Sequence, residues 1–216
     1  MRVILFGATG MIGQGVLREC LLDDRVTAVL TVGRAPTGIV HGKLREITHA
    51  DLLDLAPIEG SLAGYDACFF CLGVSSAGMN ERDYRRVTYD LTLSVARTLA
   101  RLSPDSAFVY VSGAGTDAGG RSMWARVKGE TENALLALPF RAYMFRAGFV
   151  HPRHGVTSRT RLHRVAYIVI RPLYPALRLL FPSAVTTTER IGQAMITVAE
   201  RGAPKRILEA ADINAL

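Results

Sequence analysis

Three glycines follow a short apolar run near the start of the chain, in the pattern Gly7-Ala-Thr-Gly10-Met-Ile-Gly13. Glycine lets a backbone turn tightly and approach a phosphate without a clash from a β-carbon. A helix that begins near Gly10 would direct free N–H groups and the positive end of its dipole at that phosphate. The pattern therefore predicts a loop that binds the diphosphate of a nucleotide, with an ordinary glycine-rich turn as the alternative.

An arginine, Arg34, ends the second apolar run, roughly twenty residues after the last of these glycines. A carboxylate at this position grips the 2′-hydroxyl of a ribose, whereas a guanidinium suits a 2′-phosphate. Arg34 therefore favours NADP over NAD as the cofactor. A solvated surface arginine is the alternative.

Short apolar runs that alternate with helical patterns would position this loop. Strands are expected at 2–6, 28–32, 65–72, 107–111 and 141–145, and helices at 12–21, 84–102 and 126–138. Such alternation predicts an α/β fold of parallel β-α-β units that are covered on both faces. No repeat or linker interrupts the chain, so we expect one domain over residues 1–216.

The last part of the chain departs from this alternation. Beyond a core at 1–150, we expect residues 151–216 to add a small helical appendage on the substrate side and a closing helix. Thr186-Thr-Thr-Glu189 precedes Ile191 and has the residue types of a helix cap with an acid in the first turn.

The composition is that of a folded domain, with 49% hydrophobic and 21% charged residues. No segment approaches the ~20 apolar residues of a membrane span, and Gly7 follows too soon after Met1 for a signal peptide. The three cysteines have no framework spacing, which suggests a reducing compartment. We therefore expect a cytoplasmic protein.

The net charge of +7 is unevenly distributed, because eight arginines and no acid lie between 141 and 182. A basic segment on a near-neutral body argues against nucleic acid as a partner. The favoured role is a cover over the pocket of a small, anionic substrate. Contact with an anionic membrane surface is less favoured, because Pro172 and Pro175 prevent one continuous helix. A dimer contact is the third possibility, so the chain is expected to be a monomer or a homodimer.

Six segments carry a resemblance to a known family: VILFGATGMIGQGVL, TVGR, CLGVSS, YVSGAG, WARVKGETE and FRAGFVHP. In their order and spacing they resemble the atypical short-chain dehydrogenase/reductase (SDR) superfamily, and more narrowly its NAD(P)-binding epimerase/dehydratase-like members. The resemblance covers about residues 1–150. It implies a Rossmann-type, doubly wound parallel sheet, with the dinucleotide lying across the carboxyl ends of the strands.

The resemblance also implies a set of cofactor-binding residues. Arg34 would face the adenosine ribose, and the remaining contacts follow the nucleotide from adenine to nicotinamide. Asp51 and Leu52 would contact the adenine; Gly7, Thr9, Gly10, Met11, Ile12 and Gly13 the diphosphate; Cys71, Leu72 and Gly73 the path to the nicotinamide; and Ala147, Gly148, Phe149 and Val150 the region beyond it.

The catalytic position departs from the family pattern. Members use a Tyr-x-x-x-Lys pair on one helical face, in which the lysine lowers the pKa of the tyrosine and binds the nicotinamide ribose. Here Lys128 is present, but Trp124 stands at the tyrosine position, and an indole has no titratable oxygen. Ser112 would complete the site. It is followed by Gly113, where relatives often carry a second hydroxyl.

Two functions therefore stay open. In the first, the chain is an NADP(H)-dependent reductase or epimerase-like enzyme acting on a small carbonyl or sugar-type substrate, and the proton comes from the substrate or from another tyrosine. Tyr84 and Tyr89 are candidates, although both are more simply helix-packing residues. In the second, it is a non-catalytic dinucleotide-binding regulator that acts through a partner protein or a membrane surface.

Cysteine and histidine give weaker signals. Cys68 and Cys71 are three apart in an expected buried strand, so they would point to opposite faces and act as apolar thiols, not as a redox pair. His151 and His154, with Cys20 far away, form no zinc pattern, so we expect no metal site.

Overall fold

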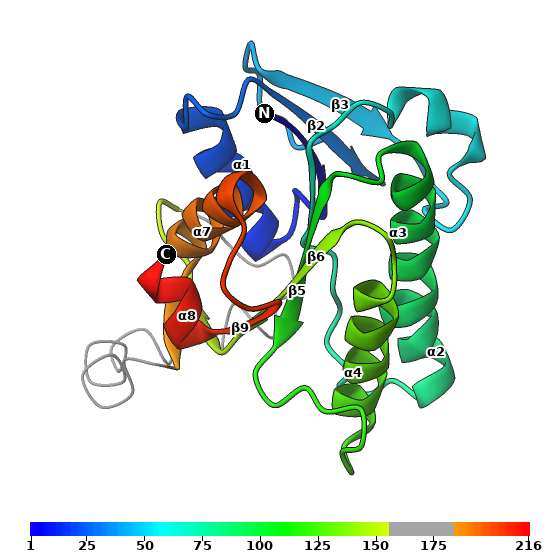
Figure 1. Cartoon of the computed structure of the whole chain (residues 1–216). Helices are drawn as coiled ribbons and strands as arrows, with labels where there is room; N and C mark the ends of the chain where they lie inside the picture. Colours follow the sequence, from blue (N-terminus) through cyan, green and yellow to red (C-terminus); the bar gives the residue numbers. More distant parts are fainter. Residues whose placement is uncertain (156–183) are drawn as a thin grey trace.

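The computed structural model describes residues 1–155 and 184–216. In these residues a seven-stranded sheet has the order β3-β2-β1-β4-β5-β6-β9, and every neighbouring pair is parallel. The predicted α/β class and the Rossmann-type doubly wound sheet are confirmed (Figure 1). The strands are β1 (Arg2–Phe6), β2 (Ala28–Gly33), β3 (Leu44–Thr48), β4 (Ala67–Phe70), β5 (Ala107–Gly113), β6 (Arg141–Ala147) and β9 (Ile207–Glu209), and a separate pair is formed by β7 (Phe149–His151) and β8 (Val185–Thr187).

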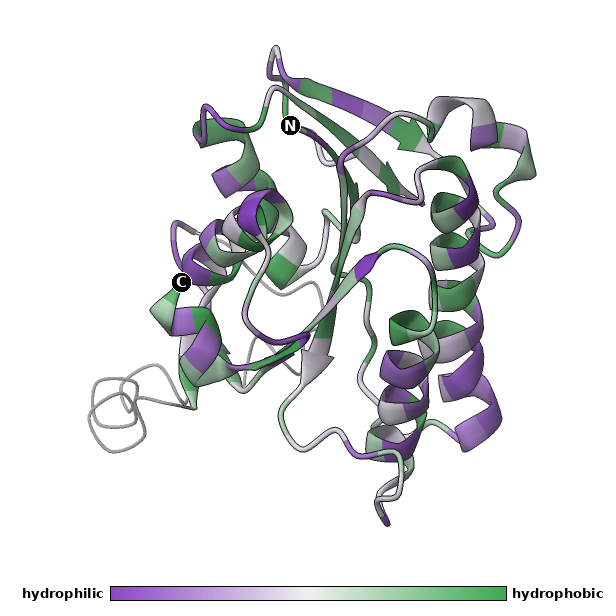
Figure 2. Cartoon of the chain, viewed as in Figure 1, coloured by the Kyte–Doolittle hydropathy of each residue, from purple (hydrophilic) through white to green (hydrophobic). Residues whose placement is uncertain are grey.

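Helices cover both faces of the sheet (Figure 1). On one face lie α1 (Met11–Leu22) and α7 (Thr188–Arg201), and on the other α3 (Leu91–Leu102) and α4 (Met123–Leu136). The central strands are therefore apolar on both sides: Val3 and Leu5 pack toward α1 and α7, while Ile4 and Phe6 pack toward the opposite face. Figure 2 shows these strands as mostly hydrophobic, with hydrophilic residues gathered on the helices.

The long helix predicted at 84–102 consists of three consecutive segments. It begins at α2 (Glu81–Arg85), continues through a π-helical turn, η2 (Arg86–Asp90), and ends with α3. The start lies earlier than predicted because the side chain of Asn80 caps the helix by accepting a hydrogen bond from the Asp83 amide, at 2.9 Å. A 3-10 helix, η1 (Ala56–Ser61), precedes β4.

The C-terminal residues belong to the main layers of the fold. The predicted cap is present, because the Thr187 side chain accepts from the Arg190 amide at the start of α7. After α7, β9 forms an edge of the sheet beside β6, and α8 (Ala210–Ala215) follows. Much of the expected helical appendage, including Pro172 and Pro175, falls in residues 156–183, which lie outside the described residues.

Two glycines bring α1 and α7 into close contact. A β-carbon at Gly15 would lie 2.5 Å from the Thr188 β-carbon, and one at Gly192 would lie 2.8 Å from Glu19 Cγ. Any larger residue at either position would push the two helices apart. The helices α1 and α7, which are far apart in the sequence, are therefore packed closely together.

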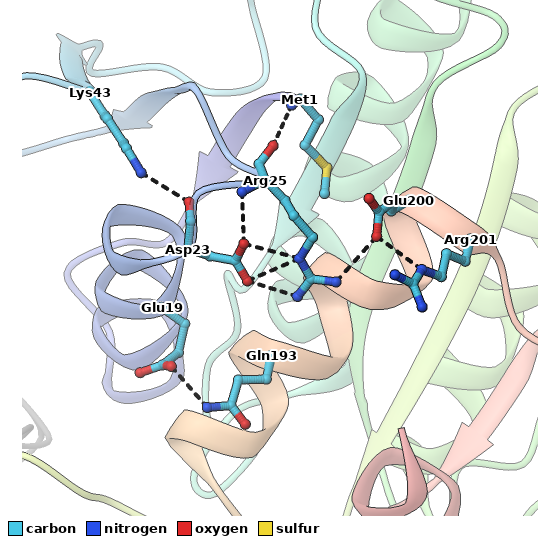
Figure 3. A network of polar contacts seen from close by, with 8 residues as sticks. All are labelled: Met1, Glu19, Asp23, Arg25, Lys43, Gln193, Glu200 and Arg201. Atoms are coloured by element: carbon cyan, nitrogen blue, oxygen red, sulfur yellow. Dashed lines mark hydrogen bonds and ion pairs between the residues drawn. The ribbon is translucent and has the colours of Figure 1, made fainter.

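Polar contacts tie the ends of the same two helices together (Figure 3). The Arg25 guanidinium pairs with Asp23, just beyond α1, at 2.7 Å and with Glu200 on α7 at 3.2 Å. The Arg25 guanidinium holds the pKa of the Asp23 carboxyl below its usual range. Gln193 on α7 donates to Glu19 on α1 at 3.1 Å. The contacts hold α1, whose other end carries the glycine loop, in a fixed position.

Candidate cofactor and substrate site

The glycine loop joins β1 to α1 in a conformation that only glycine tolerates. Gly7 has a φ of +83°, and a β-carbon at Gly13 would lie 2.0 Å from the Gly7 carbonyl oxygen. The Gly10 amide donates to that same oxygen at 2.9 Å. The loop is thus folded tightly under the first turn of α1, as the sequence predicted.

The first turn of α1 fits an anion. Its N-cap is Gly10, no side chain caps it, and no acidic residue lies in the first turn. Among the described residues, the amides of Met11, Ile12 and Gly13 therefore have no side-chain cap, and the helix dipole favours a negative charge there. The half-buried Thr9 accepts from Gln14 through its carbonyl, at 3.0 Å. These residues can hold a diphosphate.

The loops that follow β4, β5 and β6 lie at the same edge of the sheet. A β-carbon at Gly7 would lie 2.7 Å from the backbone of Cys71 and Leu72, so the segment leading to the exposed Gly73 abuts the glycine loop. After β5 and β6, the Ala114 amide donates to the Ala147 carbonyl at 3.1 Å. Ala147 is thus tied to the loop after β5, and the chain continues through Gly148 to Phe149 and the buried Val150 on β7.

The residues expected around the adenosine have different surroundings. Arg34 follows β2, is exposed, and its side chain makes no hydrogen bond or ion pair with the residues that the structure describes. Asp51 is also exposed, and its carboxylate accepts from the Leu53 amide at 2.9 Å. Leu52 is buried in the core on the α3 face, so its side chain packs against the protein.

Lys128 is placed against β5. Its Nζ donates to the Tyr110 hydroxyl at 3.3 Å and to the Val111 carbonyl at 3.4 Å. Burial lowers the pKa of Lys128, and the nearby Tyr84 and Glu132 oppose that shift only in part. The lysine is therefore a desolvated cation beside the end of the strand that carries Ser112.

Ser112 has a hydroxyl partner that the sequence did not reveal. Its Oγ lies 3.1 Å from Thr116 Oγ1, and Thr116 donates to the Gly113 carbonyl at 2.8 Å. The second hydroxyl expected next to Ser112 is thus supplied from four residues further on, across a tight turn. Thr116 lies beside Ser112 because the chain turns between them. In the sequence, the turn is indicated only by Gly115, whose φ is +81°.

Trp124, at the tyrosine position, packs on this turn. Ring atoms of Trp124 lie 3.7 Å from the β-position of Gly113 and 3.6 Å from that of Gly115. The two candidate tyrosines are engaged elsewhere: Tyr84 is buried, and the Tyr89 ring lies under the Arg85 guanidinium at 4.3 Å. The groups gathered toward the end of β5 therefore include an indole, a lysine and the hydroxyls of Tyr110, Ser112 and Thr116.

The weaker sequence signals are placed as follows. Cys68 packs in the core on the α3 face and Cys71 against the core on the α1 face, which confirms the prediction of opposite faces. His154 lies 3.4 Å from Glu189, which also pairs with Arg153. Over the described ranges, no three or more His, Cys, Asp or Glu residues are grouped so that they could hold a metal.

A parallel doubly wound sheet with a glycine loop before α1 and a lysine beside Ser112 defines a dinucleotide-binding protein of the SDR type. The model of the NAD dependent epimerase/dehydratase family matches residues 3–133, so the chain belongs to that family. The resemblance to atypical SDR proteins is confirmed.

Two curated relatives illustrate this membership. The mitochondrial protein fmp52 of Emericella nidulans is 31% identical over 156 residues, which make up 68% of this chain and 66% of the relative. The protein HTATIP2 of Rattus norvegicus is 28% identical over 149 residues, 68% of this chain and 61% of the relative. The chain thus matches just under two thirds of the length of these relatives.

Solved structures share the fold at low sequence identity. The enzyme WbmF of Bordetella bronchiseptica, in complex with NAD+, is 17% identical with a TM-score of 0.69, covering 99% of this chain and 76% of WbmF. MoeE5, in complex with UDP-glucose and NAD, is 17% identical with a TM-score of 0.70, covering 96% of this chain and 74% of MoeE5.

The expectation of a cytoplasmic protein is corrected by the relatives. FMP52 proteins from Emericella nidulans, Scheffersomyces stipitis and Meyerozyma guilliermondii are all named mitochondrial. The prediction rested on cysteine count and on the residues after Met1, which do not distinguish between these compartments. Within the described part of the chain, no helix has the length and apolar character needed to cross a membrane.

Proposed function

We propose that the chain binds NADP(H) across the carboxyl ends of β1, β4 and β5, with its 2′-phosphate on Arg34. The observation that carries this proposal is the uncapped first turn of α1 over a glycine loop, with the exposed Arg34 at the end of the neighbouring strand β2. A guanidinium that has no partner among residues 1–155 and 184–216 is available for a 2′-phosphate. Family membership supports the dinucleotide, and Arg34 supports NADP over NAD.

We further propose that the substrate is a small, sugar-type or carbonyl-bearing molecule. The complex of MoeE5 with UDP-glucose is the precedent for such a substrate. The cofactor would supply or accept a hydride when bound. Lys128 would hold the nicotinamide ribose with the Nζ donor that is not used by Tyr110 and Val111, and Ser112 would contact the substrate. With tryptophan at position 124, Lys128 is the family's catalytic-pair residue that this chain retains.

The second candidate function is cofactor binding without turnover. It is favoured by Trp124, because an indole that packs on Gly113 and Gly115 fills the position from which the family tyrosine moves a proton. Both functions share the same cofactor site. They differ in whether any substrate is converted.

Calorimetric titration with NADPH and NADH tests the cofactor site. Arg34→Ala should weaken NADPH binding by about ten- to a hundredfold, the range expected for a charge-assisted contact, and leave NADH binding within about twofold. Arg97→Ala, an exposed arginine on α3, is the matched control. If neither NADPH nor NADH binds, the proposal is rejected.

Turnover separates the two functions. NADPH oxidation is followed with a panel of carbonyl and sugar-type compounds, for the wild type and for Trp124→Tyr. Activity in the wild type supports the enzyme. Activity gained only in the variant, with unchanged NADPH affinity, supports a binding protein that has lost its proton-transfer group.

A further inference from the structure

The hydroxyl of Ser112 has its hydrogen bond direction fixed by Thr116. The Gly113 carbonyl oxygen can only accept, so the hydrogen bond of 2.8 Å to it uses the one proton of the Thr116 hydroxyl. The contact of 3.1 Å between Thr116 Oγ1 and Ser112 Oγ then has one possible donor, which is Ser112. Ser112 therefore has lone pairs to offer a ligand but no proton.

We infer that Ser112 acts as a hydrogen bond acceptor, so that the site selects a ligand group that carries a hydroxyl over one that carries a bare carbonyl. This inference deepens the proposed function, because it names the substrate group that meets the end of β5. A carbonyl oxygen and Ser112 Oγ would both present lone pairs, and no hydrogen bond could form between them.

The surrounding turn fixes the direction of the hydrogen bond from Ser112 to Thr116. Ser112 is 5% exposed and Thr116 4% exposed, so a rotated hydroxyl would lose its partner without gaining water. The Thr116 amide also donates to the Gly113 carbonyl, at 3.2 Å, which closes the turn on the oxygen that orients its side chain. The Trp124 ring covers Gly113 and Gly115 from outside.

Lys128 leaves this acceptor to the ligand. Its Nζ donates to the Tyr110 hydroxyl at 3.3 Å and to the carbonyl of Val111, the residue before Ser112, at 3.4 Å. The third Nζ donor is the one proposed above for the nicotinamide ribose. A ligand hydroxyl can donate a proton to Ser112 Oγ, whereas a ligand carbonyl has none to donate.

Matched probes test the inference: cyclohexanol and cyclohexanone, titrated against the full chain loaded with NADPH. Because Trp124 is the single tryptophan and lies on this turn, its fluorescence reports binding at the site. We expect the wild type to bind cyclohexanol roughly five- to tenfold more tightly than cyclohexanone, the effect of one hydrogen bond. Ser112→Ala should bind both equally.

The deciding variant is Thr116→Val, which removes the hydroxyl at nearly constant volume and frees the Ser112 proton. Its preference for cyclohexanol should fall to within about twofold or reverse. Thr92→Val is the control and should keep the preference, because it removes a buried hydroxyl on α3 that donates to the Thr88 carbonyl on η2. Thermal unfolding of each variant checks that it is folded.

The outcomes separate the inference from the proposed function. If NADPH fails to bind, the proposed function fails, and the probes are titrated against the free chain, where the same preference is expected. If NADPH binds but cyclohexanol does not, or if Thr116→Val keeps the wild-type preference, the inference is overturned and the cofactor site stands.

Discussion

The carboxylate of Glu132 on α4 and the guanidinium of Arg146 on β6 form a two-pronged ion pair, with contacts of 3.1 Å from Nε and 2.6 Å from the terminal nitrogen. The Glu132 side chain is 2% exposed and that of Arg146 20% exposed. Arg146 also reaches Glu209 at the end of β9, at 3.3 Å. Since Glu132 lies one helical turn after Lys128, this pair sets the position from which the lysine approaches β5.

Removing the carboxylate should therefore be strongly destabilising. Glu132→Ala leaves a largely buried guanidinium without its main partner, which we expect to lower the free energy of unfolding by about 3–5 kcal/mol in urea denaturation. Glu130→Ala is the control two residues away, since its ion pair with Arg85 is much less buried, with 39% of each side chain exposed, and should contribute at most about 1 kcal/mol. Equal losses in the two variants would contradict this account.

Adding a single β-carbon to the glycine loop should lower both the stability of the protein and its affinity for NADPH. Gly13→Ala would place that atom 2.0 Å from the Gly7 carbonyl, so the first turn of α1 has to shift away from the loop. We expect a loss of stability of about 1–3 kcal/mol and at least a tenfold weaker affinity for NADPH. Gly60→Ala, where no atom lies within 4 Å of the added carbon, should change neither. Calorimetry with unaltered NADPH affinity in Gly13→Ala would show that the loop does not hold the phosphate.

The charge of Lys128 should destabilise the fold at neutral pH. Burial lowers its pKa in the folded state, so between the folded and unfolded pKa values the unfolded chain binds more protons, and stability rises with pH through that window. Lys128→Met removes this term. The variant should have a higher thermal unfolding midpoint near pH 7, by about 2–4 °C for each kcal/mol gained in the free energy of unfolding. This gain should shrink as the pH approaches about 10.

Lys205→Met is the control for that pH series. Lys205 is more than half exposed and pairs with Asp212 on the surface, so its removal should leave the midpoint nearly unchanged at each pH. A lower midpoint for Lys128→Met at neutral pH would mean that its two hydrogen bonds outweigh the penalty of burying its charge.

The three thiols should be unreactive in the native protein. Burial raises the pKa values of Cys20, Cys68 and Cys71, which keeps them protonated at the pH of a thiol titration. We expect slow reaction with a disulfide reagent near pH 8, and reaction of all three after unfolding in guanidinium chloride. Rapid labelling of the half-buried Cys71, or a missing pair of thiols after unfolding, would contradict this prediction.

How much the sequence could predict depended on whether the signal was local. The strands at β1, β4 and β5 are apolar on both faces, so they appear as continuous runs. The edge strands β3 and β9 were missed, because β3 is largely exposed and β9 has only three residues. An edge strand has one neighbour in the sheet, so its sequence carries little of that pattern.

The same distinction applies to the site. Glycine at positions 7 and 13 is required by contacts within a few residues, so the loop could be identified from its spacing. The partnership of Ser112 with Thr116 depends on the shape of a turn, and that of Glu132 with Arg146 on the packing of a helix against a strand. Neither contact can be predicted from residue types and spacing alone.

The contact of α1 with α7 has a consequence for how the protein is made. The ribosome synthesises the glycine loop and α1 well before the Thr188 backbone that packs against Gly15. Until then, the nascent chain exposes the apolar side of its first helix and lacks one edge strand of its sheet. Final folding of the glycine loop and α1 therefore follows translation of α7 and β9, and a chain that terminates before them would be treated as incomplete by chaperones and proteases.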